Sequence, residues 1–509
     1  MVNGRRLRIT HNLSEALREL RRSVHHIKGS MAFEDAEPGS IRIWIDAICI
    51  DQKNTHERVE QVRQMGLIFR SARKVFVWLG PEGDSRERVE MITRYAQQGE
   101  EEGSYLKSFQ DGAPWTDQQI RDLKYLCNGL RLLTERPWFH RLWVIQEVVL
   151  AKESPILMVG EYQCSLSSLT DLWVELADLD YPEDLKDWKI IATFPRVLMM
   201  YDVLRDWYRS IKPGKSPEEQ LSEILPKVEN VQSTLPHDML YGFLALVAAE
   251  ALHPNLRPDY GKPYEEVYWE YSVQIILRAQ NLAIITRPTS GFEGMPTWVA
   301  DFRKPTVGQP GPTVTTNISF SADMRRLFVE GAALGSCISA YRSSMKDHLT
   351  RAEALRFQKE ILKPAAARRQ GRTWEESFRE FTEAFLSYTL GARKVEFRLS
   401  HFQSLLRGEL NEGCGQPCGD LLAKTLSEYW IIVTDGGVIG IANQDSGVQV
   451  GDELVILKGA HMPFLLRATG DGKDSHRLVG PCMVAGELKD EEYGTEFFAH
   501  RTVSQFTLV

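Results

Sequence analysis

"IWIDAICIDQKNTHERVEQVRQMGLIFRSARKVFVWLG", residues 43–80, decides how the N-terminal part of the chain is expected to fold. Residues 41–50 are rich in β-branched side chains and almost continuously apolar, a pattern typical of a strand buried on both faces of a parallel sheet. Residues 56–72 follow with the spacing of an amphipathic helix, and residues 74–80 predict a second strand. Strand, helix and strand at this spacing predict a βαβ crossover, and therefore an α/β domain.

Beyond this stretch the chain divides into three regions of different character. Residues 1–165 continue the α/β pattern, and residues 166–312 are rich in helical patterns that prolines interrupt. Residues 313–509 contain short strands punctuated by glycine, aspartate and proline, which predict a small antiparallel β-rich domain, either a barrel or a sandwich. A charged helical insertion at 347–410 interrupts these strands, and its segment "KPAAARRQGRTW", residues 363–374, is predicted to be an exposed loop. Further elements are expected as helices at 12–27, 117–134, 137–152 and 263–279 and as a strand at 155–160.

The composition argues against several classes of partner and site. A net charge of −8 over 509 residues gives no general affinity for nucleic acid. The longest apolar run, residues 239–252, is too short to span a bilayer and includes Glu250, so no membrane association is predicted. Seven scattered cysteines and an N-terminal stretch without a secretory signal favour a reducing compartment, so a cytoplasmic location is expected. Cys414 and Cys418 have metal-like spacing but no second pair, and the familiar cofactor motifs are absent, so neither a metal nor a bound cofactor is predicted.

The stretch "RLWVIQEVVL", residues 141–150, places a glutamate among apolar residues of an expected helix. A buried carboxylate is costly unless it is paired or used, so Glu147 needs an explanation. Trp143 precedes it by four residues and shares its helix face. In a structural explanation, Glu147 pairs with Arg136, Arg141 or a backbone amide, and Trp143 is ordinary core. In a functional explanation, the carboxylate takes part in a reaction.

Two dense blocks of motif lie in the first 150 residues. The first block contains a Trp-x-Asp-x-x-Cys-x-x-Gln pattern, formed by Trp44, Asp46, Cys49 and Gln52, and a Trp-Leu-Gly strand end at 78–80. The second block is an Arg-x-Trp-Phe-x-Arg-x-Trp-x-x-Gln-Glu pattern, formed by Arg136, Trp138, Phe139, Arg141, Trp143, Gln146 and Glu147. Together these blocks resemble the heterokaryon-incompatibility (HET) domain of filamentous fungi. Segments at 236–246, 257–268 and 295–302 are similar to the middle region of large HET proteins, and segments at 448–468 and 476–487 to their C-terminal region.

The resemblance implies a fold and an activity for the first region. HET domains are similar in architecture to TIR domains, so a TIR-like, flavodoxin-like α/β fold is expected for residues 1–165. The family's usual first strand, which ends in Ser-Tyr-x-Trp-Gly, has no counterpart here, and the sheet is expected to lack it. Some TIR domains hydrolyse NAD through a glutamate in a Trp-x-x-x-Glu setting, which Trp143 and Glu147 match. The resemblance therefore implies Glu147 as a catalytic residue and NAD as a substrate rather than a cofactor.

The same resemblance suggests which residues would bind the substrate. Ligands of open α/β sheets gather outside the carboxyl ends of the strands, where Asp46, Cys49 and Gln52 would be delivered, with Trp143 beside the glutamate. Two of these residues have a structural alternative. Asp46 could bind backbone amides at the strand end, and Cys49 could be a buried, inert thiol.

At the level of the organism, the resemblance implies non-self recognition after fungal cell fusion, ending in growth arrest or programmed cell death. The partner would then be an incompatible allelic or non-allelic protein, and the HET domain could form a homo-oligomer. The alternative is a non-catalytic signalling scaffold that acts by self-association. A further alternative is an accessory gene product without a role in incompatibility.

Overall fold

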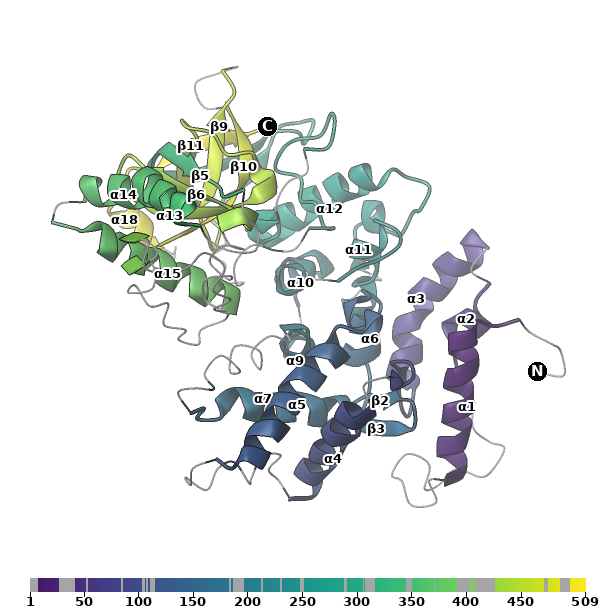
Figure 1. The fold of residues 1–509 in the computed structure, drawn as a ribbon. Coiled ribbons are helices and arrows are strands. Elements are labelled where there is room, and N and C mark those ends of the chain that lie inside the picture. Colours follow the sequence, from purple (N-terminus) through teal and green to yellow (C-terminus); the bar gives the residue numbers. More distant parts are fainter. Residues whose placement is uncertain are drawn as a thin grey trace. The chain divides into compact units, whose positions relative to one another are not determined.

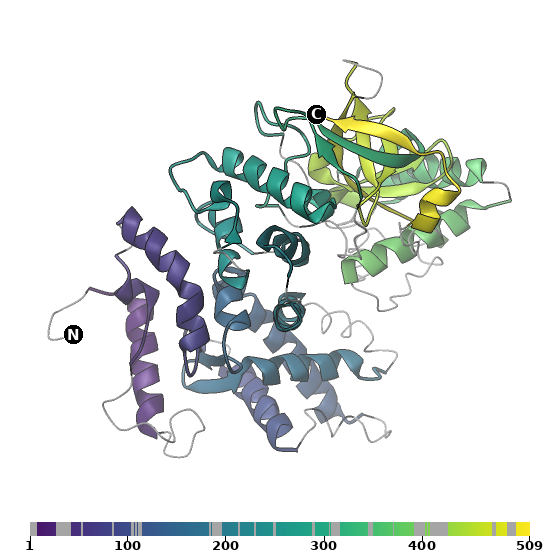
Figure 2. The ribbon, with the colours of Figure 1, turned by 180° about the vertical axis from the view of Figure 1, so that it is seen from behind.

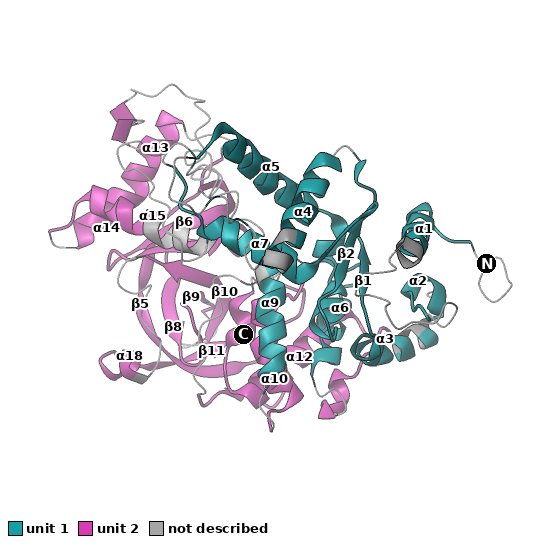
Figure 3. Ribbon diagram, turned by 90° about the horizontal axis from the view of Figure 1, so that it is seen from below, with its two compact units in different colours: residues 1–211, 230–249 teal, residues 212–229, 250–509 magenta. Residues whose placement is uncertain are grey.

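Contacts divide the chain into two compact units (Figure 3). Unit 1 comprises Met1–Ile211 and Asn230–Ala249, and unit 2 comprises Lys212–Glu229 and Glu250–Val509. The computed structural model describes residues 8–26, 42–51, 54–83, 86–102, 106, 109, 115–182, 185, 196–211, 214–228, 231–247, 251–287, 291–304, 306, 316–344, 350–369, 371–390, 403–404, 406–407, 426–470, 475–485 and 495–509. Unit 1 thus contains a segment, 230–249, that is separated in sequence from the rest of the unit.

Unit 1 contains a three-stranded sheet with helices packed on it (Figure 1). Strand β1 (Phe76–Trp78) pairs in parallel with β2 (Ile156–Val159), as the strands expected at 74–80 and 155–160 require. The chain then turns at Gly160, whose φ of +54° suits glycine, into the antiparallel strand β3 (Tyr162–Ser165). β1 is the edge strand of this sheet in the described part of the chain.

Amphipathic spacing predicts three of the unit 1 helices correctly. The helices expected at 12–27, 56–72 and 117–134 are confirmed, and the apolar face of the second is buried through Val62 and Phe69. The helical elements of unit 1 are α1 (His11–His26), α2 (Asp46–Cys49), α3 (Thr55–Ser71), α4 (Arg86–Glu102), α5 (Asp117–Thr134), η3 (Pro137–His140), α6 (Val144–Val149), α7 (Leu166–Asp178), α9 (Arg196–Arg209), α11 (Asp238–Tyr241) and η6 (Leu244–Leu246). α4 packs against β3 and contacts both α5 and α7.

The prediction of a strand at residues 41–50 is wrong. Residues 42–45 have no regular structure, and α2 follows as a single turn with no buried residue. β-propensity depends on neighbouring strands, and no described strand flanks β1 on its open side. Instead, Trp44 packs edge-on against Phe69 of α3 with ring centroids 5.9 Å apart. Only the helix and the second strand of the predicted βαβ crossover are therefore present.

Unit 2 begins with short helices and ends in a β-rich region. Its first elements are α10 (Pro217–Ile224), η5 (Leu225–Lys227), η8 (Pro254–Leu256), α12 (Tyr264–Ala279) and η9 (Ala283–Thr286). α12 confirms the helix expected at 263–279, and it packs against α10. The guanidinium of Arg287 donates to the carbonyl of Leu225 at 2.6 Å, which ties the chain after η9 to η5.

The strands of unit 2 pair in a closed ring (Figure 2). The elements are β4 (Ser319–Phe320), β5 (Leu327–Tyr341), β6 (Tyr429–Thr434), β7 (Ile439–Asn443), η11 (Gln444–Ser446), β8 (Glu453–Leu457), β9 (Phe464–Ala468), β10 (Ser475–Val484), α18 (Thr495–Ala499) and β11 (Ser504–Leu508). Antiparallel pairing runs through β10, β7, β6, β5, β8 and β9 and returns to β10, so the expected antiparallel β-rich region is a barrel. Bulges near Gly335 and Gly480 bend the two longest strands, which lets each pair with different neighbours along its length.

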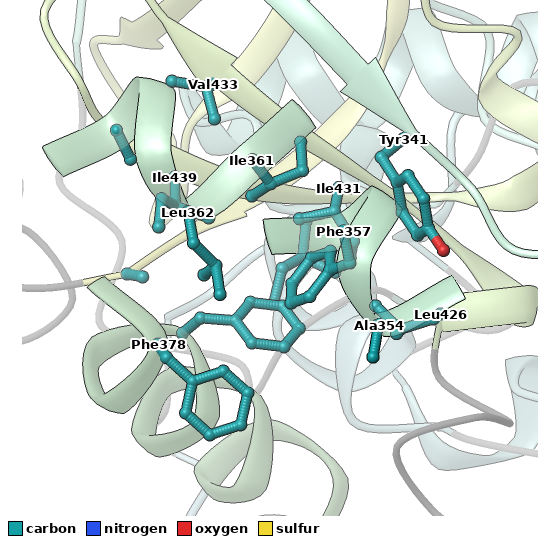
Figure 4. Close-up of a cluster of buried hydrophobic side chains, with 14 residues drawn as sticks. Tyr341, Ala354, Phe357, Ile361, Leu362, Phe378, Leu426, Ile431, Val433 and Ile439 are labelled. Atoms are coloured by element: carbon teal, nitrogen blue, oxygen red, sulfur yellow. The ribbon is translucent and has the colours of Figure 1, made fainter. Parts of the chain in front are cut away.

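The insertion packs on this barrel through a large apolar cluster (Figure 4). It contains α13 (Arg351–Phe357), the π-helical turn η10 (Gln358–Leu362), α14 (Lys363–Arg368) and α15 (Trp374–Leu390). The prediction of an exposed loop at 363–374 is therefore wrong for its first half. That half forms α14, in which Ala365 is only 1% exposed. Gly437 in the β6–β7 turn lets α14 approach closely, because a Cβ added there would lie 2.9 Å from the Ala365 carbonyl oxygen. Cys414 and Cys418 lie outside the described residues.

The packing of α13 gives a direct test of this arrangement. Phe357 is fully buried, whereas Leu355, two residues earlier on the same helix, is 44% exposed. Phe357→Ala should lower the free energy of unfolding by about 3–5 kcal/mol, because it leaves a cavity under the helix. Leu355→Ala should change it by less than about 0.5 kcal/mol. Urea denaturation of both variants measures the difference, and equal losses would contradict the packing of α13 on the barrel.

Candidate functional site

Glu147 lies on a short helix whose start is fixed by a distant segment of chain. The continuous helix expected at 137–152 is broken into η3 and α6. Between them Arg141 is extended, with φ −80° and ψ 131°, and forms a parallel β-bridge with Gln232. The backbone N–H of Gln232 donates to the His140 carbonyl at 2.6 Å, and its carbonyl accepts from Leu142 N at 2.9 Å. These bonds replace the helical hydrogen bonds that a continuous helix would make here.

The break brings a different tryptophan to Glu147 from the one expected. Trp138 of η3 donates its indole N–H to Glu147 Oε2 at 3.0 Å, across nine residues of sequence. Trp143 instead occupies the N-cap position of α6 and is half-buried. Its carbonyl oxygen accepts from the backbone N–H of Gln146 at 3.1 Å and of Glu147 at 3.4 Å. The carboxylate therefore does have an indole partner, which comes from the turn before the helix.

Burial is the main influence on the carboxyl group of Glu147. It raises the pKa above the ordinary value of 4.5, since a low-dielectric surrounding disfavours the charged form. The Trp138 hydrogen bond and the positive charge of Arg141 act in the opposite direction, and the negative charge of Asp46 raises the pKa further. Burial raises the pKa of the Tyr201 hydroxyl, on α9, and the nearby negative charge of Glu147 raises the pKa of Tyr201 further. A carboxyl whose pKa is raised above its ordinary value is better suited to accept a proton in acid–base chemistry.

Neither Arg136 nor Arg141 forms the ion pair with Glu147 that the structural explanation requires. Arg136 donates instead to the carbonyl oxygens of Leu79 and Pro81, at 2.7 and 3.1 Å. Arg141 is exposed and acts on Glu147 only through its charge. Among the described residues, no cationic group lies within the 4.0 Å of an ion pair with Glu147.

The residues expected to bind a substrate differ in their burial and in their relation to Glu147. Asp46 begins α2 and is half-buried, and its carboxylate is close enough to influence Glu147. Its Oδ1 also accepts from the backbone N–H of Ala47 at 2.7 Å. Cys49 ends the same turn with an exposed thiol, so it is not the buried thiol of the structural alternative. Gln52 lies outside the described residues.

Two residues near Glu147 were not singled out by sequence reasoning. The hydroxyl of Tyr201 donates to the Phe139 carbonyl at 2.9 Å and so fixes the turn that carries Trp138. Gln146 is fully buried and donates to the Gly242 carbonyl at 2.7 Å. Gln146 is part of the quoted motif, which could have signalled a role, whereas Tyr201 comes from a helix with no local signal.

The described residues contain neither a metal-ligating cluster nor a helix that could span a membrane. In the described parts of the chain, no group of three or more histidine, cysteine or acidic side chains is placed to bind a metal ion. No helix among those residues is both long enough and apolar enough to cross a membrane. What unit 1 offers is a carboxyl of raised pKa, a second carboxylate and an indole donor, carried by an α/β unit.

The N-terminal part of this unit is similar to known proteins. Residues 1–147 match the family model described as "Heterokaryon incompatibility protein (HET)". The chain is 29% identical over 285 residues to "Heterokaryon incompatibility protein 6, OR allele" of Neurospora crassa, which covers 50% of this chain and 40% of that protein. No solved structure matches the chain. Residues 1–147, which carry the glutamate-bearing block, are therefore similar to HET domains.

The raised pKa predicts how Glu147 affects stability. A carboxyl that binds its proton more tightly when folded destabilises the protein as pH rises from 4.5 through its raised pKa. Glu147→Gln resembles the protonated form at every pH. Its free energy of unfolding should therefore exceed that of the wild type at pH 7.5 and approach it below pH 4.5.

Urea denaturation at both pH values measures this difference. Glu135→Gln, which removes an exposed carboxylate paired with Arg131, is the matched control and should shift stability by less than about 1 kcal/mol. A Glu147→Gln variant that is less stable than the wild type at pH 7.5 would show that the carboxylate is a structural ion-pair partner.

Proposed function

We propose that this protein acts in heterokaryon incompatibility, in the recognition of non-self after fungal cells fuse. The HET domain at residues 1–147 and the similarity to a Neurospora crassa heterokaryon incompatibility protein support this proposal. The chain spans 40% of the length of that relative. The expected outcome of the recognition is growth arrest or programmed cell death, in response to an incompatible allelic or non-allelic partner in the cytoplasm.

The proposed chemistry is the hydrolysis of NAD or a related nucleotide, with Glu147 as the catalytic residue. The observation that carries it is a half-buried carboxyl of raised pKa, held by the Trp138 indole and without an ion-pair partner among the described residues. Such a group is costly to keep and suited to a reaction, because stability is commonly given up at functional sites.

The reaction is written as NAD⁺ plus water giving ADP-ribose, nicotinamide and a proton. The bond between the ribose C1′ and the nicotinamide nitrogen breaks, and its electron pair leaves with nicotinamide. The positive charge that develops on the ribosyl centre is stabilised by the Glu147 carboxylate, which then accepts the proton of the attacking water. A raised pKa makes Glu147 a stronger base for that second step.

Other residues of the site have proposed binding roles. Asp46 is the best placed of them, because its charge already acts on Glu147. Cys49 lies on the same turn three residues later and therefore shares its face. Trp143 and Gln52 complete the proposed substrate-binding set, and Trp138 holds the reacting carboxylate in place.

A second candidate function is a non-catalytic scaffold that signals by self-association. It is favoured by two large apolar side chains exposed on unit 1, Ile43 at 51% and Leu67 at 67%. They are close in sequence to Trp44 and Phe69, which pack together. Exposed apolar side chains of this kind suit contact with a second copy of the domain.

Nicotinamide release by the purified full chain separates the two candidates. The wild type should hydrolyse NAD, and Glu147→Gln should lower kcat by about 10²-fold or more, because the variant lacks the charge that the transition state requires. Glu135→Gln should retain wild-type turnover, since its carboxylate lies on the exposed surface. If the wild type releases no nicotinamide from NAD or related nucleotides, the enzyme proposal fails.

Expression in a fungal host tests the proposed biological role. Full-length protein should arrest growth, and Glu147→Gln should relieve the arrest at an equal protein level. Colony growth rate with immunoblotting is the measurement. Normal growth with the wild type would count against the incompatibility role, and arrest by both proteins would favour the scaffold.

A further inference from the structure

Residues 231–247, here called the strap, touch the chain at two places shortly before Glu147. The strap belongs to unit 1, although it lies more than 80 residues after the HET match ends. At its start, Gln232 exchanges two backbone hydrogen bonds with His140 and Leu142. At its other end, the Gly242 carbonyl accepts from the buried side chain of Gln146 at 2.7 Å. The strap therefore contacts the residues immediately before α6 and the residue next to Glu147.

Close packing leaves the strap little room to move. A Cβ added at Gly242 would lie 2.7 Å from Leu142 Cδ2, so the chain passes directly over this leucine. On the other side, a Cβ added at Gly66 of α3 would lie 2.6 Å from the Ala245 Cβ. The Arg70 side chain also donates to the Ala245 carbonyl. The strap is thus held between α3 and the α6 segment.

The helix that carries Glu147, α6, depends on contacts with other segments for its position. α6 has six residues, which is too few for a helix that is stable by itself. The angle between η3 and α6 is set at Arg141, where the bridge to Gln232 keeps the backbone extended. That angle places the Trp138 indole against the Glu147 carboxylate.

We propose that the strap is the positioning element of the Glu147 site, and that Gln146 and Gln232 are the positioning residues through which it acts. The strap does not contact the Glu147 carboxylate directly. It contacts Arg141 and Gln146, and through them it sets the distance between Glu147 and Trp138. The positioning itself is a structural statement, and its effect on catalysis rests on the proposed NAD hydrolysis.

The test moves one methyl group across the contact between α3 and the strap. In full-length protein, Gly66→Ala places a methyl against Ala245, whereas the double variant Gly66→Ala with Ala245→Gly restores the original volume. Alanine is favourable within a helix, so a loss cannot come from weaker α3 propensity. Gly129→Ala is the matched control, because a Cβ added at this α5 glycine would also meet a neighbour closely, Ile92 Cδ1 at 2.9 Å, and its nearest atoms all belong to α4.

Hydrogen exchange of the α6 amides is the first readout. Gly66→Ala should accelerate exchange across 144–149 about tenfold or more, Gly129→Ala should leave it unchanged, and the double variant should restore it. Nicotinamide release is the second readout, where kcat of Gly66→Ala should fall about 10²-fold at unchanged KM, with recovery in the double variant.

Each result has a separate meaning for the two proposals. Unchanged α6 exchange in Gly66→Ala, equal acceleration in Gly129→Ala, or no recovery in the double variant would overturn the positioning role. A wild type without turnover would remove the proposed hydrolysis alone, and the exchange data would still decide the role of the strap.

Discussion

Two backbone hydrogen bonds at Gln232 hold the chain extended at Arg141, and the arrangement around Glu147 depends on them. Without them, the apolar spacing of this stretch favours one continuous helix, as the sequence itself predicts. With them, the stretch becomes a turn and a short helix set at an angle. The Trp138 indole then reaches Glu147, and the buried Gln146 finds a partner in Gly242.

The electrostatics of Glu147 follow from this geometry. Burial between η3, α6 and α9 raises the pKa of the carboxyl, and the nearby Asp46 adds to the effect. One indole hydrogen bond and the charge of an exposed Arg141 offset it only in part. The fold thus keeps a carboxyl in an unfavourable setting, and such settings concentrate at sites where a reaction takes place.

Sequence periodicity predicted the elements whose packing is local. The helices α3, α5 and α12, the strands β1 and β2 and the barrel strands all follow from spacing and turn residues. It failed at residues 41–50, because apolar β-branched residues form a strand only beside another strand. At residues 363–374 a charged, alanine-rich segment looked exposed, yet Ala365 is buried under a contact with the distant Gly437 turn.

The candidate site was predictable in its main residue and not in its surroundings. Glu147 stood out because a carboxylate among apolar residues is costly. Its partner was expected at Trp143 by helical spacing, but the helix break, caused by a contact some 90 residues away in sequence, substitutes Trp138. Cys49 is exposed because the strand that would have buried it did not form. The TIR-like topology and the NAD chemistry stay predictions.

Titration of the Trp138 indole resonance tests the central claim most directly. In wild-type protein labelled with ¹⁵N-tryptophan, the signal that disappears in Trp138→Phe is followed as pH is raised. Because this N–H donates to Glu147, its chemical shift should change with a single midpoint above 4.5, the ordinary pKa of a glutamate. A signal that does not titrate, or one with a midpoint at or below 4.5, would contradict the account.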